Sequence, residues 1–238
     1  MKRIQLLFSL AALAAVLPMS RAGDVSGTVT LKGTPPPEKD IAPLKNDVNC
    51  GKFHPEMPKT RFYAVSANGG LADVVVVIKG VPNAKSTGPA APPVVLDQKG
   101  CEYTPYVFAV QTDQKITAKN SDPVMHNVHA VPAIAGNTEK NQAQAPGGPD
   151  LTFTFPKPET FLKFECNVHP WMFSYACVID HPYFAVTDKD GKFTIKNVPD
   201  GKYTIQALHR KAAPASSPAS KDIEVKGATT ADFTLEVK

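Results

Sequence analysis

Short apolar segments separated by turn-forming residues run through most of the chain. Residues 24–33 alternate apolar and polar positions and end at a glycine, which is typical of a half-buried strand. Residues 74–78 read Val-Val-Val-Val-Ile, a continuous β-branched run that favours a strand buried on both faces. No long stretch has a helical period. The pattern therefore predicts an all-β chain.

Turn-rich stretches divide this pattern into three blocks. The Pro- and Ala-rich residues 82–93 end the first block and are interpreted as a linker or long loop. In the second block we expect strands at 106–110, 115–119, 125–131, 151–155, 160–166 and 175–180, with a loop at 132–150. In the third we expect a hairpin of 184–187 and 193–196 around a turn at 188–191, strands at 203–208, 222–226 and 231–237, and a loop at 210–220. Strands of this number suit two β-sandwiches.

Residues 1–22 have the charged, apolar, small-residue order of a secretory signal peptide. Their apolar run is too short to span a bilayer, which needs about 20 residues, and no later run is long enough. We expect cleavage after Ala22, which makes the mature protein periplasmic or secreted. The formal net charge of +4 would fall to about +1, because three basic residues leave with the signal. A near-neutral chain gives no support for nucleic-acid or anionic-membrane binding.

Four cysteines in an exported protein first suggest two disulfides. Cys50 and Cys101 have no neighbours at good metal-ligand spacing, so we expect a disulfide between them. Strand alternation places Cys166 on the inner face of its strand, at the strand's end. Cys177 lies on an apolar strand, and we expect a buried free thiol there.

The segment that begins at Cys166 reads Cys-Asn-Val-His-Pro-Trp-Met, so Cys166, His169 and Met172 share one short loop. A fourth residue, His126, stands on a distant expected strand. Thiolate and thioether are soft ligands and imidazole is intermediate, so this set suits both oxidation states of copper. Two histidines and a cysteine, with a distant axial methionine, form a type 1 copper site. The sequence therefore predicts one copper ion held by these four residues.

This segment resembles the ligand loop of the cupredoxins, and its C-x-x-H-x-x-M spacing is most similar to that of amicyanin. The resemblance covers about residues 94–181 and implies a Greek-key β-sandwich, a type 1 copper and electron transfer between redox partners. It also implies that Asn127 forms a hydrogen bond near the cysteine loop and tunes the metal. Met125, Pro170 and Trp171 flank the ligands, and we expect them to form an apolar patch for a redox partner.

The two flanking blocks are similar to carboxypeptidase regulatory-like domains, which are transthyretin-like sandwiches without catalytic function. The similarity rests on Gly-Thr-Val-Thr-Leu-Lys-Gly at 27–33 and on Thr-Asp-Lys-Asp-Gly at 187–191. We expect residues 23–93 and 182–238 to form one such domain, with the cupredoxin-like residues inserted into it. Three modules in a row are the alternative.

We expect a one-electron carrier that is not itself an enzyme. A copper carrier or sequestration protein would use the same ligands and release the metal, but such proteins often carry Met- or His-rich tracts. A copper oxidase or nitrite reductase would need further paired histidines, and here only His126 and His129 stand close together. A sandwich that has lost its metal is the remaining alternative.

We expect His129 on the strand face opposite His126, and surface positions for His54, His181 and His209.

Overall fold

The computed structural model describes residues 21–211 and 219–237, and strands dominate this part of the chain. The all-β prediction is confirmed, since the helical segments are short: α1 (Ala42–Asn46) and the 3-10 turns η1 (Cys50–Phe53) and η2 (Gly88–Ala90). Across the described ranges, no helix combines the length and apolar character needed to cross a membrane. The predicted signal peptide lies, except for its last two residues, outside the described residues.

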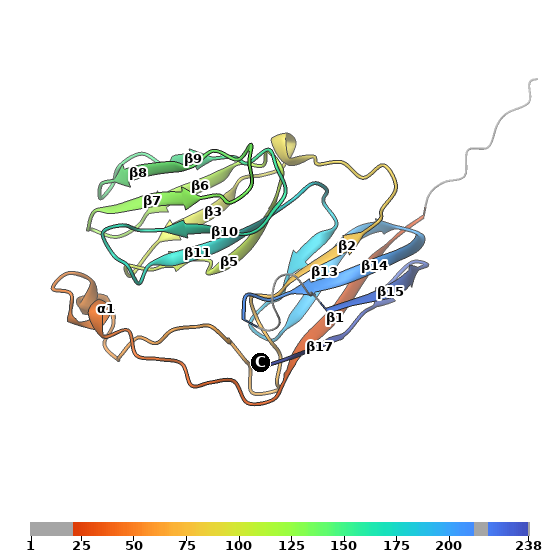
Figure 1. Ribbon diagram of the computed structural model, residues 1–238, viewed down its shortest axis with the longest axis horizontal. Helices are drawn as coiled ribbons and strands as arrows, with labels where there is room; N and C mark the ends of the chain where they lie inside the picture. The colour runs from red at the N-terminus through yellow and green to blue at the C-terminus, as the bar shows by residue number, and fades with distance from the viewer. Residues whose placement is uncertain (1–20, 212–218, 238) are drawn as a thin grey trace, which may run out of the picture.

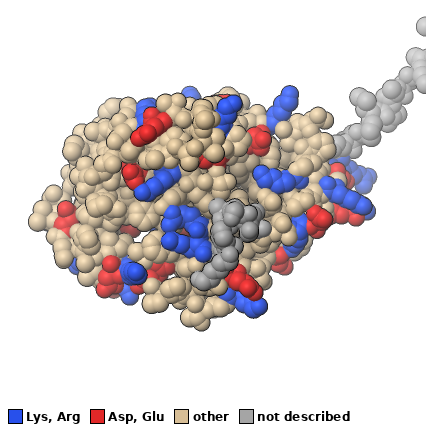
Figure 2. Space-filling view, in the orientation of Figure 1, with Lys and Arg blue, Asp and Glu red and all other residues tan. Residues whose placement is uncertain are grey.

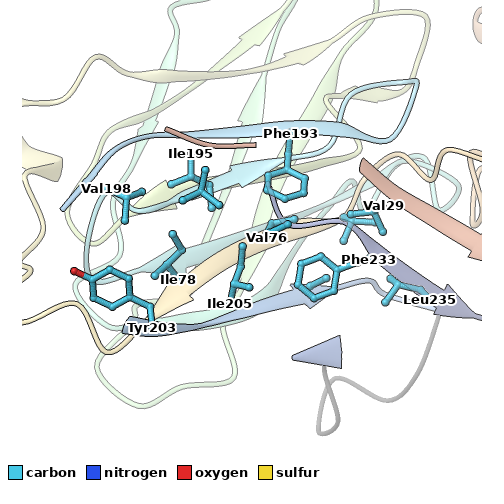
Figure 3. Close-up of a cluster of buried hydrophobic side chains, with 14 of the residues drawn as sticks. Val29, Val76, Ile78, Phe193, Ile195, Val198, Tyr203, Ile205, Phe233 and Leu235 are labelled. Carbon is cyan, nitrogen blue, oxygen red and sulfur yellow. The ribbon is translucent and has the colours of Figure 1, made fainter. Parts of the chain in front are cut away.

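Strands from both ends of the chain form the first sandwich (Figure 1). In one sheet, β1 pairs with the other three members: β1 (Ala22–Lys32), β13 (Lys192–Pro199), β16 (Thr229–Thr230) and β17 (Phe233–Glu236). The facing sheet contains, in spatial order, β12 (Phe184–Val186), β2 (Val75–Lys79), β14 (Gly201–Leu208) and β15 (Ala219–Val225). Figure 3 shows the core between them, where Val29 and Phe193 meet Val76 and Ile205.

The second sandwich also consists of two sheets. The larger one contains, in spatial order, β5 (Val107–Gln111), β11 (Phe173–Ile179), β10 (Glu159–Glu165), β7 (His126–Val131) and β8 (Lys140–Gln144). The smaller one contains β4 (Tyr103–Thr104), β3 (Val94–Gln98), β6 (Ile116–Asn120) and β9 (Leu151–Phe153). Phe164 is completely buried between them, in ring contact with Phe108 and Phe153. In the chain, these nine strands come between β2 and β12, which are neighbours in the first sandwich.

The β-branched run at 74–78 is buried on both faces, as its sequence predicts. Alternate side chains of the run belong to the core of the first sandwich. The others, Val75 and Val77, share a hydrophobic cluster with Tyr175 and Cys177 of β11, so β2 lies at the junction of the two sandwiches. Cys177 is a buried free thiol, as expected, and burial raises its pKa to about 12.

Two local predictions were wrong. The stretch 132–150 is not entirely loop, because it contains β8, an edge strand paired with β7. Its residues Lys-Asn-Gln-Ala-Gln lack the apolar alternation that marks a strand in sequence. The expected hairpin at 184–196 does not form either. Its turn is present, with Gly191 N donating to Asp188 O, but β12 pairs with β2 and β13 pairs with β1. The turn therefore joins two different sheets.

The surface positions expected for His181 and His209 were also wrong, since both side chains are buried. Each histidine packs against a tyrosine ring: His181 against Tyr183 and His209 against Tyr63. For His209 the sequence gives no sign of this neighbour, because Tyr63 comes from a distant segment, whereas Tyr183 lies only two residues from His181.

The chain between β1 and β2 leaves the first sandwich and reaches one end of the second (Figure 1, orange). Its residues 41–54, called the cap below, contain α1 and η1. Cys50 of the cap forms a disulfide with Cys101 of the second sandwich, as expected from the sequence. Leu44 is completely buried in the same small cluster as this disulfide, with Trp171 packed against it.

Candidate metal centre

Three of the four predicted ligands meet in a buried cluster at one end of the second sandwich. His126 opens β7, Cys166 directly follows the neighbouring strand β10, and His169 lies on the loop between β10 and β11. His126 Nδ1 is 2.9 Å from His169 Nδ1, and Cys166 Sγ is 3.7 Å from His169 Nδ1. One potential ligand atom from each residue lies within 4.8 Å of the other two.

The loop between β10 and β11 is closed by its own backbone. Met172 N donates to His169 O at 2.9 Å, and Cys166 N donates to Met172 O at 3.0 Å. Met172 is 1% exposed and shares a hydrophobic cluster with Cys166, which is 2% exposed. His126 and His169 are 0% and 8% exposed, so all four predicted ligands lie where water is largely excluded.

Asn127 joins β7 to this loop. Its Oδ1 accepts the backbone N–H of Asn167 at 2.7 Å and that of Val168 at 3.3 Å. The same oxygen lies 3.3 Å from Cys166 Sγ. Its Nδ2 donates to the side-chain oxygens of Asn141 and Asn167 at 2.7 and 2.8 Å. Asn127, predicted to lie near the cysteine loop, thus contacts that loop three times through its Oδ1 oxygen.

Asp122 contacts His126 on the side of the ring that faces away from the cluster, and it was not among the predicted site residues. Its Oδ2 is 2.9 Å from His126 Nε2, and its oxygens accept the backbone N–H groups of Gly100 and Cys101, each at 2.7 Å. Burial works against the charged carboxylate, but these hydrogen bonds outweigh it and the pKa of Asp122 lies below its ordinary value. An N–H on Nε2 that donates to this carboxylate leaves the lone pair of neutral His126 on Nδ1, which faces the cluster.

The cluster also shifts the proton affinities of its own members. Burial alone would raise the pKa of Cys166, but hydrogen bonds from His126 and from its surroundings hold it below the ordinary value. Burial alone would lower the pKa of His126, but Asp122 and Cys166 raise it above the ordinary value. Burial and the neighbouring His126 lower the pKa of His169. A thiolate and a neutral imidazole are the forms that bind metals, and together with the thioether of Met172 they match the ligand preferences of copper.

The cap covers the outer side of His169. A carboxylate oxygen of Asp47 and Cys50 Sγ both lie within 4.8 Å of a His169 ring nitrogen. The ring of Trp171 contacts His169 with centroids 5.2 Å apart, and its Nε1 donates to Cys101 O at 3.1 Å. Trp171 therefore contacts both the histidine and the backbone of a disulfide cysteine.

The three residues expected to form a docking patch lie in different surroundings. Met125 is 53% exposed and Pro170 is exposed, whereas Trp171 is half-buried beside the cap. Two further apolar side chains next to the centre face solvent: Val168 is 50% exposed and Val48 of the cap is 76% exposed. The patch itself stays a prediction.

His129 lies on the face of β7 opposite His126, as strand alternation indicates. Its Nε2 is 2.6 Å from a Glu139 oxygen and its Nδ1 is 3.5 Å from a Glu165 oxygen. These two carboxylates account for the position of the ring on the outside of the sheet.

Solved structures similar to part of this chain include several whose descriptions name copper. A Cu-containing nitrite reductase from Thermus scotoductus SA-01 has 20% sequence identity and a TM-score of 0.33, covering 37% of this chain and 23% of that one. The chain thus spans about a quarter of the length of that reductase. A Cu(I) amicyanin mutant and an oxidised amicyanin mutant have 19% and 20% identity, each with a TM-score of 0.33, covering 43% of this chain and 97% of theirs. No protein-family model and no curated protein matches the sequence.

Proposed function

We propose that this chain is an exported copper protein that carries single electrons between redox partners. One type 1 copper would be held by His126, Cys166, His169 and Met172. The observation that supports this most is the buried convergence of two imidazoles and a thiol from separate elements, next to a buried methionine. When bound, the copper would supply the one-electron chemistry by alternating between two oxidation states.

The surrounding residues would keep the ligands in place through that cycle. Asn127 anchors the loop backbone at 167 and 168, and Asp122 fixes the tautomer and orientation of His126. Ligands held by hydrogen-bonded neighbours move little when the charge of the metal changes. A preorganised, largely dry site of this kind favours electron transfer over ligand exchange.

The wider proposal covers location and domain arrangement. The disulfide of Cys50 and Cys101 suits an oxidising compartment, which supports export. We propose that residues 94–181 form an inserted cupredoxin domain, and that the flanking sandwich holds it without catalytic activity of its own. On the face in Figure 2, basic and acidic side chains are interspersed, so a redox partner that binds there would meet a surface of mixed charge.

The decisive test is the visible spectrum of residues 23–238 loaded with Cu(II). We expect an intense thiolate-to-copper band towards the red end of the visible range, bleached by ascorbate and restored by an oxidant. Cys166→Ser should abolish the band. Cys177→Ser, which removes the free thiol at the other end of β11, is the matched control and should keep it. Copper that binds without this band, or a band that survives Cys166→Ser, would refute the proposal.

Two other functions would give different results with the same samples. A copper carrier would lose its metal to a chelator in minutes with the cap closed, whereas an electron carrier would retain it over many redox cycles. A nitrite reductase would consume nitrite catalytically when supplied with an electron donor, and the proposed carrier would not.

A further inference from the structure

The cap is attached to the second sandwich by few contacts besides its disulfide. In the described part of the chain, one side-chain hydrogen bond joins the two, between His54 Nε2 and Gly100 O at 2.7 Å. The other hydrogen bonds recorded for the cap stay within residues 41–58, such as Cys50 N to Asp47 Oδ1 at 2.8 Å and Ile41 N to Pro58 O at 2.8 Å. The apolar contact is also small, since the buried cluster under the cap contains Leu44, Cys50 and Cys101 alone as fully buried members.

Residues 39–43 and 59–62, at the two ends of the segment that carries the cap, are separated from the second sandwich by a groove. A groove of about 400 Å³ lies between these residues and the sandwich. Ile41 and Phe62 line one wall of the groove, and Tyr103, Trp171 and Phe173 line the other. Without a covalent link, the segment would have little apolar surface with which to hold its position.

The point of attachment is next to the ligands. Cys50 Sγ lies within 4.8 Å of a His169 nitrogen, and Cys101 Sγ lies within 4.8 Å of a His126 nitrogen. Both cysteines are completely buried, so the bond is covered when the cap is closed. The disulfide therefore lies beside both histidines of the centre.

We propose that the Cys50–Cys101 disulfide is a latch that a dithiol reductant opens, and that the opened cap allows metal to enter and leave through His169. In the opening step the sulfur–sulfur bond breaks and the two sulfurs of the dithiol become bonded to each other. The two electrons and two protons given up by the dithiol end on the thiols of Cys50 and Cys101. Closed, the protein holds its metal for electron transfer; opened, it exchanges it. The metal-exchange role rests on the proposed function, but the opening of the cap does not.

The test uses metal-free full-length mature chain and needs no copper. The oxidised protein, the dithiothreitol-treated protein and a Cys50→Ser/Cys101→Ser variant are labelled with a bulky maleimide, and each cysteine is followed by peptide mass spectrometry. Cys166 should react roughly tenfold faster or more in the variant than in the oxidised protein, because labelling requires local opening. Cys177, buried at the junction of the sandwiches, is the internal control and should keep its rate. Fluorescence of Trp171 should shift to longer wavelength as its cover is lost.

Three results would overturn the latch. Cys166 could stay protected in the double variant, which would mean that the cap holds without its disulfide. Both thiols could react faster to the same degree, which would mean general loosening of the fold. The disulfide could resist dithiothreitol while the protein is folded, which would exclude opening by a dithiol. If Cys166 is labelled faster as expected, metal exchange is then tested by the transfer of copper from the variant to a chelator. Because the labelling step uses no copper, a failure of the copper proposal is distinguished from a failure of the latch.

Discussion

Replacing Asn127 by alanine measures how firmly the ligand loop is held. The change removes the oxygen that accepts from the backbone N–H groups of Asn167 and Val168, and Asn127 is only 7% exposed. An unpaired buried donor costs about 1–3 kcal/mol. The contact to Val168 is the longer of the two at 3.3 Å and contributes less. Both N–H groups are only part-buried and can bind water once freed, so we expect the free energy of unfolding of the second sandwich to fall by about 1–3 kcal/mol.

Urea unfolding of the metal-free protein at pH 7, followed by the fluorescence of Trp171, is the assay. Trp171 is the one tryptophan in the sequence and belongs to the second sandwich, so it reports the transition in question. Asn141→Ala is the matched control, because it removes one partner of Asn127 Nδ2 on the exposed side and should cost less than about 1 kcal/mol. The reasoning fails if Asn127→Ala costs no more than Asn141→Ala.

Two further predictions concern ionisable groups. Asp122→Asn should weaken copper binding roughly 10–100-fold in a chelator competition, because the amide can present its NH₂ group to His126 Nε2 and disturb the tautomer; unchanged affinity would exclude that role. Burial and the charge of Arg210 lower the pKa of His209 from 6.5 to about 4. Between these pH values His209 is therefore neutral in the folded chain and protonated in the unfolded chain. Stability should therefore fall as the pH drops from 6.5 towards 4, by about 2.5 kcal/mol at pH 4.5, and His209→Gln should remove that part of the pH dependence in urea titrations.

The proposed copper ligands could be selected from the sequence because most of them are close together along the chain. Cys166, His169 and Met172 share a single loop, and strand alternation places Cys166 inward. Apolar periodicity likewise predicted β1, β2 and most strands of the second sandwich, since each buries a regular set of side chains. It missed β3, β4 and β8. The pairing of β8 with β7 depends on backbone groups at a sheet edge and requires no apolar residue.

The position of the cap beside the centre could not be predicted from the sequence, for a different reason. Its disulfide could be expected from the pairing of leftover cysteines, but the two residues are 51 positions apart, so the sequence did not show that the bond lies beside the histidines. Leu44 gains its burial from Trp171 and the disulfide, which belong to distant segments. A helix of five residues is too short to show a helical period in the sequence.

These missed features form one connected path to the centre. Cys101 is bonded to Cys50 through sulfur, and its backbone N–H donates to Asp122 Oδ2, the same oxygen that contacts His126 Nε2. A movement of Cys101 when the cap is released would therefore disturb the carboxylate that sets the tautomer of His126. Access to His169 and the donor strength of His126 would change together, because both depend on the position of Cys101. This shared dependence is the physical reason to expect that the disulfide influences how tightly the centre would hold the proposed metal.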